Sequence, residues 1–237
     1  MLVKTKAIVI SSVKYQEKSL IVKCLTLSDG LKSYFVRDAF STSKKATKKS
    51  AYFQPLTLLE IEANHKNKNT LEYFLSIKPI VYQTIPNDFL KSSLVLFLSE
   101  VFHFSIKEEG KNEDLFLFLE AALLWLDENK ITTNFHLIVL LELTKFLGFY
   151  PNVSEEDFFE LTEGIFTRFQ SKTCLNLSES QLLKTLLNHK IDSLENPFST
   201  SERRKLLEII LNYYSHHIEY FKKPKSLEVF KEVFSAV

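Results

Sequence analysis

The chain has 237 residues, of which 45% are hydrophobic and 25% are charged, a composition typical of globular rather than disordered proteins. Its four glycines are too widely spaced for G-x-G-x-x-G or G-x-x-x-x-G-K-[ST], so nucleotide-binding loops of those kinds are excluded. Its two cysteines, Cys24 and Cys174, exclude a disulfide framework and a four-cysteine zinc site within one chain. The apolar run at 7–10 is too short for a signal peptide, and no stretch approaches the ~20 apolar residues that cross a bilayer. We therefore expect a cytoplasmic protein with no membrane partner.

Charge is divided unevenly along the chain. Residues 1–80 carry fourteen Lys and Arg against six Asp and Glu, a net charge of +8. Residues 81–237 carry sixteen against twenty-three, a net charge of −7. Such asymmetry favours a polyanionic partner for the first part. The alternative is a lysine-rich surface with no partner.

Alternation of apolar and polar residues, interrupted by turn residues, predicts five strands near the N-terminus. They are expected at residues 3–12, 20–27, 31–39, 53–63 and 70–81. Five short strands in about 80 residues suit a small closed barrel such as the OB-fold.

Beyond residue 81 the apolar period changes from two to about 3.6, which predicts helices. Apolar stripes indicate them at 90–101 and 115–126, and the segment 135–147 is apolar on nearly every side. Gly148 is expected to end that helix as a C-cap.

Two later helices are expected to begin at the capping boxes Ser178-x-x-Gln181 and Ser199-x-x-Glu202, and a short hairpin is expected at 158–169. The sequence thus predicts an α+β chain. A basic five-stranded OB-fold barrel would span residues 1–81, and an all-α helical domain would span residues 82–237.

The sharpest motif is a loop with four lysines in six positions, Lys44, Lys45, Lys48 and Lys49. Lysines in such a loop would neutralise phosphates and give salt-sensitive binding without sequence preference. A solvated charged loop is the alternative. The other candidates for DNA binding share the same domain: Lys4, Lys6, Lys14, Lys32 and Arg37.

Aromatic residues lie among these cations. They could stack on bases, as in OB-type single-strand binders, or they could pack in the core. The sequence does not settle which face of its strand Tyr34 or Phe35 occupies. The candidates are Tyr15, Tyr34, Phe35, Phe40 and Tyr52.

No group of residues indicates catalysis, a metal or a cofactor. His216 and His217 are adjacent, so on a helix they would point about 100° apart and could not readily hold one ion together. Cys24 and Cys174 have no base beside them in the sequence. We expect no enzyme, no catalytic residue and no cofactor, although a hydrolase assembled from residues distant in sequence remains an alternative.

Short motifs recur along nearly the whole chain. The early ones are Lys6-Ala7-Ile8-Val9-Ile10, Tyr15-x-Glu17-x-Ser19-Leu20-Ile21-Val22 and Gln54-Pro55-Leu56-x-Leu58-x-Glu60. The later ones are Leu147-Gly148-Phe149-x-Pro151-Asn152, Arg203-Arg204-x-Leu206-Leu207 and Tyr213-Tyr214-x-x-His217. In order and spacing, these motifs resemble the RecO family of bacterial DNA repair proteins, the recombination mediators of the RecF pathway.

The chain departs from that family pattern at two places. Many relatives carry a four-cysteine zinc module after Gly-Phe-x-Pro, whereas residues 152–190 contain only Cys174 here. We therefore expect no zinc site and the hairpin at 158–169 in its place. Asp38 follows Arg37 where the family tends to have glycine, so the chain differs from the family directly after this arginine.

The resemblance implies an OB-fold followed by a helical domain, binding of single- and double-stranded DNA, and annealing of complementary strands. It also implies partnership with RecR, contact with the acidic C-terminal tail of single-stranded DNA-binding protein, and indirect help to RecA. Arg203 and Arg204 match family arginines and are the candidates for binding that tail, with solvent-facing helix charges as the alternative. The runner-up function is a protein-interaction scaffold whose basic barrel binds acidic peptides.

Overall fold

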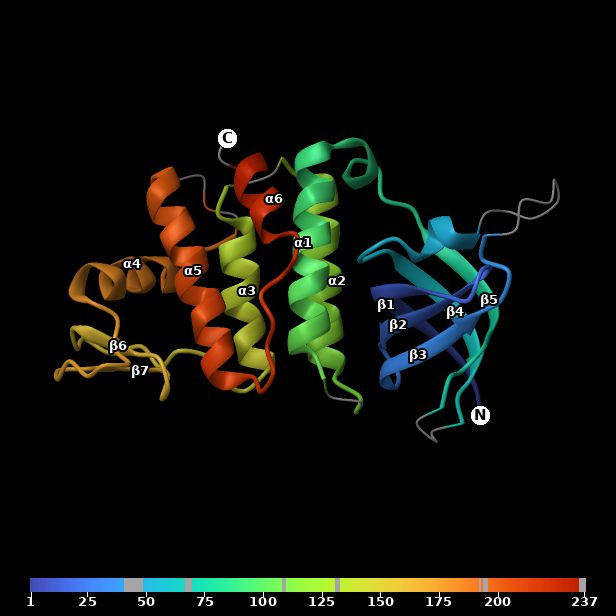
Figure 1. Cartoon of the computed structure of the whole chain (residues 1–237), viewed down its shortest axis with the longest axis horizontal. Coiled ribbons are helices and arrows are strands. Elements are labelled where there is room, and N and C mark those ends of the chain that lie inside the picture. Colours follow the sequence, from blue (N-terminus) through green and yellow to red (C-terminus); the bar gives the residue numbers. More distant parts are fainter. Residues whose placement is uncertain are drawn as a thin grey trace. The chain divides into compact units, whose positions relative to one another are not determined.

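The computed structural model describes residues 1–40, 49–66, 70–107, 110–130, 133–191, 193 and 196–234. The chain forms two compact units, residues 1–130 and 131–237. The first unit holds the larger sheet with two helices, and the second holds the remaining helices with a two-stranded sheet (Figure 1).

Five antiparallel strands form the larger sheet in the order β3-β2-β1-β4-β5. Its two edges meet where Tyr34 on β3 forms a parallel bridge with Glu72, just before β5. The closed sheet, with a short 3₁₀ helix between β3 and β4, confirms the predicted OB-fold barrel and the α+β class. The elements are β1 (Leu2–Tyr15), β2 (Ser19–Thr26), β3 (Gly30–Val36), η1 (Lys49–Phe53), β4 (Leu58–Asn64) and β5 (Phe74–Ile80).

The strands of the barrel are buried on both faces over much of their length. One set of side chains fills the barrel, including Val9, Val22 and Tyr34. Because successive side chains on a strand alternate, their neighbours point outward, yet several of these are also at most 1% exposed, among them Ile8, Ile10, Leu25 and Leu58. The helix α1 (Phe89–Ser105) contacts β1 and covers part of this outer face.

The predicted strand over 53–63 is wrong in its first part. Phe53 ends η1, and β4 begins only at Leu58. Pro55 has no N–H for a strand ladder, and Leu56 takes a left-handed backbone with φ of 54°. The chain therefore turns between η1 and β4, where the Leu56 N–H donates to the Val9 carbonyl at 2.8 Å.

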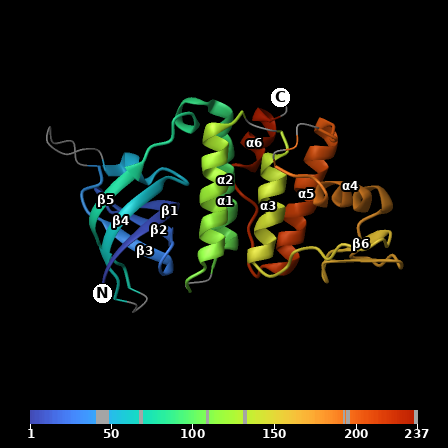
Figure 2. The same ribbon diagram turned by 180° about the vertical axis from the view of Figure 1, so that it is seen from behind.

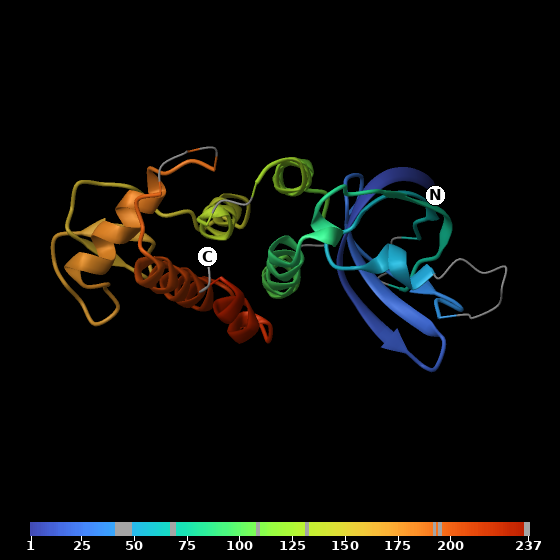
Figure 3. The same ribbon diagram turned by 90° about the horizontal axis from the view of Figure 1, so that it is seen from above.

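Both helices of the first unit are tied to the segment that leaves the barrel. Asp127, near the end of α2 (Glu113–Glu128), accepts hydrogen bonds of 2.7, 2.8 and 2.9 Å from the N–H groups of Gln83, Thr84 and Ile85. The buried Lys91 ammonium of α1 donates to the carbonyls of Asp127 and, at 2.7 Å, Asn129. Figure 3 shows both helices on the same side of the barrel. The short η2 (Ile85–Asn87) precedes α1.

The second unit begins with α3 (Phe135–Phe146), whose end is a Schellman motif. Gly148 has a φ of 84°, and the Phe149 N–H donates to the Thr144 carbonyl at 3.0 Å. Gly148 ends the helix as predicted, although the C-cap itself is Leu147 and Gly148 is the residue after it. The helices α4 (Leu177–Leu187) and α5 (Thr200–His217) pack against α3 and against each other. The strand β6 (Phe158–Glu160) contacts α4 and pairs with β7 (Ile165–Thr167), as Figure 2 shows for β6 and α4. A short helix, α6 (Leu227–Val233), follows.

The capping box at Ser199 and Glu202 is confirmed at the start of α5. The other predicted box is wrong by two residues, because Asn176 caps α4 and pairs with Glu179. The Asn176 amide oxygen accepts the Glu179 N–H at 2.9 Å. Asn is among the strongest N-cap residues, so it begins the helix before Ser178 can.

The strands β6 and β7 pair as a two-stranded antiparallel sheet at the place where a hairpin was expected. Gly164 lies in its turn with a φ of 68°, and a Cβ there would collide with the Tyr213 hydroxyl. That hydroxyl donates to the Phe149 carbonyl at 2.6 Å, and the Phe149 ring stacks on His217 with centroids 4.9 Å apart. The Gly-Phe-x-Pro segment therefore anchors the hairpin to α5.

Candidate nucleic-acid interface

Two of the predicted DNA-binding lysines are held by carboxylates of the same unit. Lys4 Nζ lies 2.7 Å from Oε1 of Glu62, its partner across the β1–β4 pair. Lys6 Nζ lies 2.8 Å from Oε1 of Glu120 on α2, whose side chain is only 10% exposed. Each ammonium group has an anionic partner, which reduces the charge that it offers to a phosphate.

Lys14 and Arg37 are exposed near the ends of β1 and β3. Lys14 Nζ lies 5.9 Å from the ring centroid of Phe40, a cation–π contact. Neither Lys14 nor Arg37 forms an ion pair within the described residues. These two cations are therefore the best placed of the described candidates to meet phosphates.

The remaining predicted cations of the barrel are Lys32, Lys44, Lys45, Lys48 and Lys49. Lys32 is half-buried on β3, opposite Cys24 in the strand register. Lys49 begins η1, and its side chain lies outside the described residues. The other three loop lysines, Lys44, Lys45 and Lys48, also lie outside the described residues.

Three aromatic rings form a row across the outer face of the barrel, and we call Tyr15, Phe35 and Tyr73 the aromatic row. The ring centroids of Tyr15 and Phe35 lie 6.0 Å apart at an interplanar angle of 82°. Those of Phe35 and Tyr73 lie 5.9 Å apart at 70°. The row joins the end of β1, the face of β3 and the segment before β5. OB-folds bind oligonucleotides at the corresponding strand face and loops.

Barrel closure sets which of two adjacent aromatic residues joins this row. Tyr34 points inward, is fully buried and stacks on Phe74 with ring centroids 4.1 Å apart. Phe35 therefore points outward and is half-buried. The Phe35 N–H donates to the Glu72 carbonyl at 2.9 Å, which places the next residue, Tyr73, beside Phe35.

The structure separates the five aromatic candidates of the sequence. Tyr15 and Phe35 belong to the aromatic row, and Phe40 is exposed within a cation–π contact with Lys14. Tyr34 lies in the core of the barrel, and the partly buried Tyr52 packs against that core. The sequence pattern did not indicate Tyr73 as a surface aromatic residue, because it placed residues 70–73 within the last strand, whereas β5 begins at Phe74. The signal that could have indicated Tyr73 is its position directly after the polar segment between the last two strands.

A chain of polar groups lies inside the barrel beneath Tyr34. The Tyr34 hydroxyl lies 2.7 Å from His65 Nε2, and His65 Nδ1 lies 2.9 Å from Asp29 Oδ2. Burial raises the pKa of Tyr34 above its usual value, and the charges of Asp29 and Glu72 act in the same direction. Because Tyr34 and His65 are at most 2% exposed, these contacts satisfy polar groups that the barrel buries.

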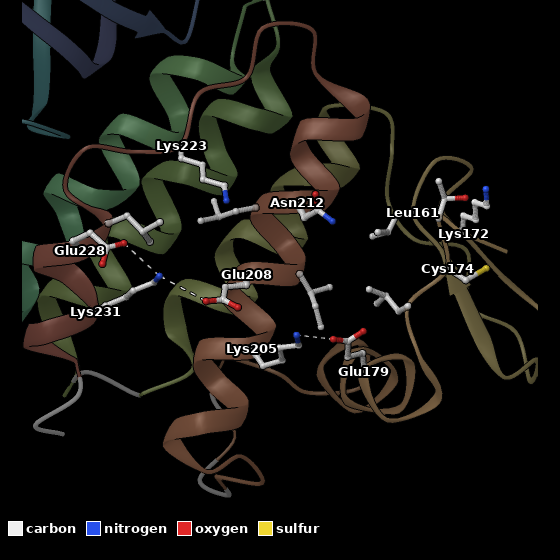
Figure 4. Close-up of a pocket in the computed structure, with 15 residues that line it drawn as sticks. Leu161, Lys172, Cys174, Glu179, Lys205, Glu208, Asn212, Lys223, Glu228 and Lys231 are labelled. Carbon is white, nitrogen blue, oxygen red and sulfur yellow. Dashed lines mark hydrogen bonds and ion pairs between the residues drawn. The ribbon is translucent and has the colours of Figure 1, made fainter. Parts of the chain in front are cut away.

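The second unit contains a cavity of about 510 Å³ between α5, α6 and the start of α4 (Figure 4). Ion pairs tie its lining together: Lys205 Nζ lies 2.6 Å from Glu179, and Lys231 Nζ lies 3.4 Å from Glu228. Because lysines and glutamates nearly balance, the cavity is no continuous cationic track. Its charged residues are Lys172, Lys205, Lys223, Lys231, Glu179, Glu208 and Glu228.

The two arginines proposed for the acidic tail differ in their surroundings. Arg203 is only 8% exposed, and its guanidinium donates to the Phe198 carbonyl at 2.9 Å and to Thr200 Oγ1 at 3.1 Å. Arg204 is exposed. The pocket beside them has a volume of about 20 Å³, room for about one water molecule. A peptide side chain would therefore have to lie on the surface beside Arg204.

Two absences within the described ranges concern membrane insertion and metal binding. In that part of the chain, no helix has the length and hydropathy needed to cross a bilayer. The same residues contain no group of three or more His, Cys, Asp or Glu that could hold a metal ion.

Two sequence profiles of a known family match the chain. The profile described as "Recombination protein O N terminal" matches residues 1–82, and "Recombination protein O C terminal" matches residues 86–228. The chain belongs to the RecO family. Membership assigns it a role in DNA repair and recombination.

Similar RecO proteins match over the full length. The DNA repair protein RecO of Flavobacterium johnsoniae is 61% identical, over 99% of this chain and 100% of that relative. The RecO of Flavobacterium psychrophilum is 60% identical with the same coverage, and that of Christiangramia forsetii is 42% identical, also with the same coverage. The two RecO profiles meet between residues 82 and 86, whereas the compact units meet at 130 and 131.

Proposed function

We propose that the protein acts in recombination as a mediator that binds single- and double-stranded DNA through the barrel and anneals complementary strands. In this role it would help to load RecA onto DNA coated by single-stranded DNA-binding protein. The observation that carries the proposal is the net charge of +8 in residues 1–80, together with the exposed cations Lys14 and Arg37 near the ends of β1 and β3. RecO family membership supports the recombination role.

The proposed mechanism is electrostatic. Each phosphate that a lysine or arginine neutralises releases counterions, so the affinity falls as salt rises. Two complementary strands that are screened by the same cationic surface repel each other less, which lets their bases pair. No bond is made or broken, so we propose no enzymatic activity for this chain.

Fluorescence anisotropy with a labelled single strand, at ~50 to 200 mM salt, tests the proposal. We expect affinity that falls steeply with salt and faster annealing of complementary strands. Replacing the four loop lysines by alanine, at 44, 45, 48 and 49, should lower affinity for every sequence and flatten the salt dependence. A matched control removes four exposed lysines of the second unit, Lys172, Lys222, Lys223 and Lys225.

Two results would contradict this assignment. Unchanged affinity in the loop variant would remove the loop from the DNA-binding site. Absence of DNA binding at the lowest salt, together with binding of acidic peptides, would favour the protein-interaction scaffold, the second candidate that the basic barrel allows.

The resemblance to the RecO family also implies two protein partners. We propose RecR as a binding partner and Arg204, which is exposed on α5, as a contact for the acidic C-terminal tail of single-stranded DNA-binding protein. Calorimetry with a tail peptide should show weaker binding to Arg204→Ala. Lys205→Ala is the matched control, because Lys205 has the same charge on the same helix. Equal loss in both variants would contradict a specific role for Arg204.

A further inference from the structure

Arg203, near the start of α5, is a buried cation without a counter-anion in its described surroundings. It is 8% exposed, and its guanidinium donates to the Phe198 carbonyl at 2.9 Å and to Thr200 Oγ1 at 3.1 Å. Both acceptors are neutral. Among the described residues, no carboxylate forms an ion pair with Arg203, and burial lowers its pKa. A buried charge is normally compensated, because removing an ion from water is costly.

Positive charge gathers around a small pocket beside this side chain. The pocket has a volume of about 20 Å³ and is lined by Arg203, Arg204 and Lys231 among others, and we call it the Arg203 pocket. None of its described lining residues is Asp or Glu. Lys231 also lies 3.7 Å from Glu208 and 3.4 Å from Glu228, as the dashed lines of Figure 4 mark. Those carboxylates partly offset Lys231 but not Arg203, so the pocket favours an anion.

His136 of α3 is a second, independent indication of a ligand in the Arg203 pocket, which it also lines. It is 4% exposed, and its Nδ1 has no hydrogen-bond partner among the described atoms. Its ring packs edge-to-face against Phe230 and Phe234, with centroids 4.9 and 5.7 Å away. These apolar rings give the imidazole no acceptor. Buried polar atoms without a partner are uncommon in folded proteins and call for an explanation such as a bound ion or water.

We propose that the Arg203 pocket binds one monatomic anion, such as chloride, between the guanidinium of Arg203 and the imidazole of His136. The pocket has room for about one particle the size of a water molecule. Chloride is a single atom that is only slightly larger than water, whereas a phosphate or a carboxylate group has several atoms. All the residues involved belong to the second unit, so the inference is independent of DNA binding by the barrel.

The anion would connect three segments that are distant in the sequence. His136 lies at the start of α3, Arg203 at the start of α5, and Lys231 in α6. A neutral imidazole carries a proton on one nitrogen, so Nδ1–H of His136 would donate to the anion together with Arg203. A ligand that binds only the folded chain stabilises it increasingly with ligand concentration. Chloride is therefore expected to raise the melting temperature.

Thermal melting of the full chain tests the inference at about pH 7.5, where histidine is mainly neutral. Sodium chloride replaces sodium gluconate at constant ionic strength, so that general screening by salt stays the same. We expect the melting temperature to rise by about 3 °C or more and to level off below ~200 mM chloride. An unchanged melting temperature would overturn the site.

Sodium acetate distinguishes a monatomic anion from the carboxylate of a peptide. Acetate in place of chloride should give no rise, because a carboxylate group exceeds the volume of the Arg203 pocket. A rise with acetate equal to that with chloride would overturn the restriction to a monatomic anion.

Two variants locate the effect. Arg203→Met should abolish the rise with chloride, and His136→Phe, which keeps an aromatic ring without a donor, should reduce it. The readout is the difference between the two salts, so a general loss of stability in a variant does not affect the test. Arg168→Met is the matched control: Arg168 is an exposed arginine of the same unit, 3.3 Å from Glu156. It should keep the full rise. A full rise in Arg203→Met would contradict the assignment.

Bromide gives a direct readout that does not depend on any variant. Anomalous scattering from crystals of the wild-type chain grown with sodium bromide should show one bromide within hydrogen-bond distance of Arg203 and His136. Bromide found only on exposed lysines would be an adventitious ion only, and it would overturn the inference.

Discussion

Lys6 on β1 and Glu120 on α2 form an ion pair of 2.8 Å that ties the barrel to its neighbouring helix. The Glu120 side chain is only 10% exposed, whereas that of Lys6 is 44% exposed. A lysine that the sequence assigns to DNA thus has a structural partner. The pair gives a nearly buried carboxylate a cationic partner.

We expect Lys6→Met to lower the free energy of unfolding by about 1–3 kcal/mol, because it leaves Glu120 without its cation. Urea denaturation measures the loss. Lys78→Met is the control: its pair with Glu60, at 3.2 Å, is exposed on both sides and should contribute ~0–1 kcal/mol. Lys6→Met should also lower DNA affinity less than Lys14→Met does. The opposite order of the two affinities would restore Lys6 to the DNA-binding site.

His136 predicts a dependence of stability on pH. Burial, and secondarily the charge of Arg203, lower the pKa of His136 to about 3, and its Nδ1 has no hydrogen-bond partner among the described atoms. In the unfolded chain a histidine has a pKa of about 6.5. Between pH 6.5 and 3 the unfolded state therefore binds more protons, so stability is full above this window and falls as the pH drops through it.

His136→Leu should remove this contribution. We expect the stability of the wild type, relative to the variant, to fall by about 1.4 kcal/mol per pH unit below pH 6 and to be constant above pH 7. Denaturant titrations of both proteins from pH 5 to 8 measure the difference. A difference that does not vary with pH would show that His136 is not held neutral in the fold.

The surroundings of Gly164 predict that even the smallest substitution there lowers the stability of the fold considerably. Gly164→Ala places a Cβ against the Tyr213 hydroxyl at a backbone φ of 68°, which residues with side chains rarely adopt. We expect a loss of more than about 1 kcal/mol of stability, measured by thermal melting. Gly110→Ala is the matched control, since a Cβ there would have no atom of the described residues within 4 Å apart from its chain neighbours. Equal melting temperatures for the two variants would contradict the close contact.

The unit boundary predicts which fragment folds. Residues 1–130 include α1 and α2, whereas a fragment of residues 1–81 would expose outer-face side chains that the full chain buries, including Ile8, Ile10, Leu25 and Leu58. We expect the longer fragment to melt cooperatively as a monomer and the shorter one to aggregate. Circular dichroism and size-exclusion chromatography distinguish them. Cooperative melting of 1–81 would instead support a separate barrel domain with that boundary.

Local patterns in the sequence determined most of the secondary structure. Alternation indicated five strands, Gly148 indicated the end of α3, and Ser199 with Glu202 indicated the start of α5. Each depends on residues a few positions apart. The pattern misplaced the start of β4, because it did not weigh Pro55 and the left-handed Leu56 between η1 and that strand.

Contacts between distant residues were decided only by the tertiary structure. Strand alternation puts Tyr34 and Phe35 on opposite faces of β3 but does not say which face is the core. The bridge from Tyr34 to Glu72 closes the barrel with Tyr34 inside, and the same bridge brings Tyr73 to the aromatic row. The ion pair between Lys6 and Glu120 joins residues 114 positions apart. The composition fixed the charge available to the barrel. Strand register and barrel closure decided which charges are paired and which rings face outward. Pairing and facing both depend on where distant segments of the chain meet.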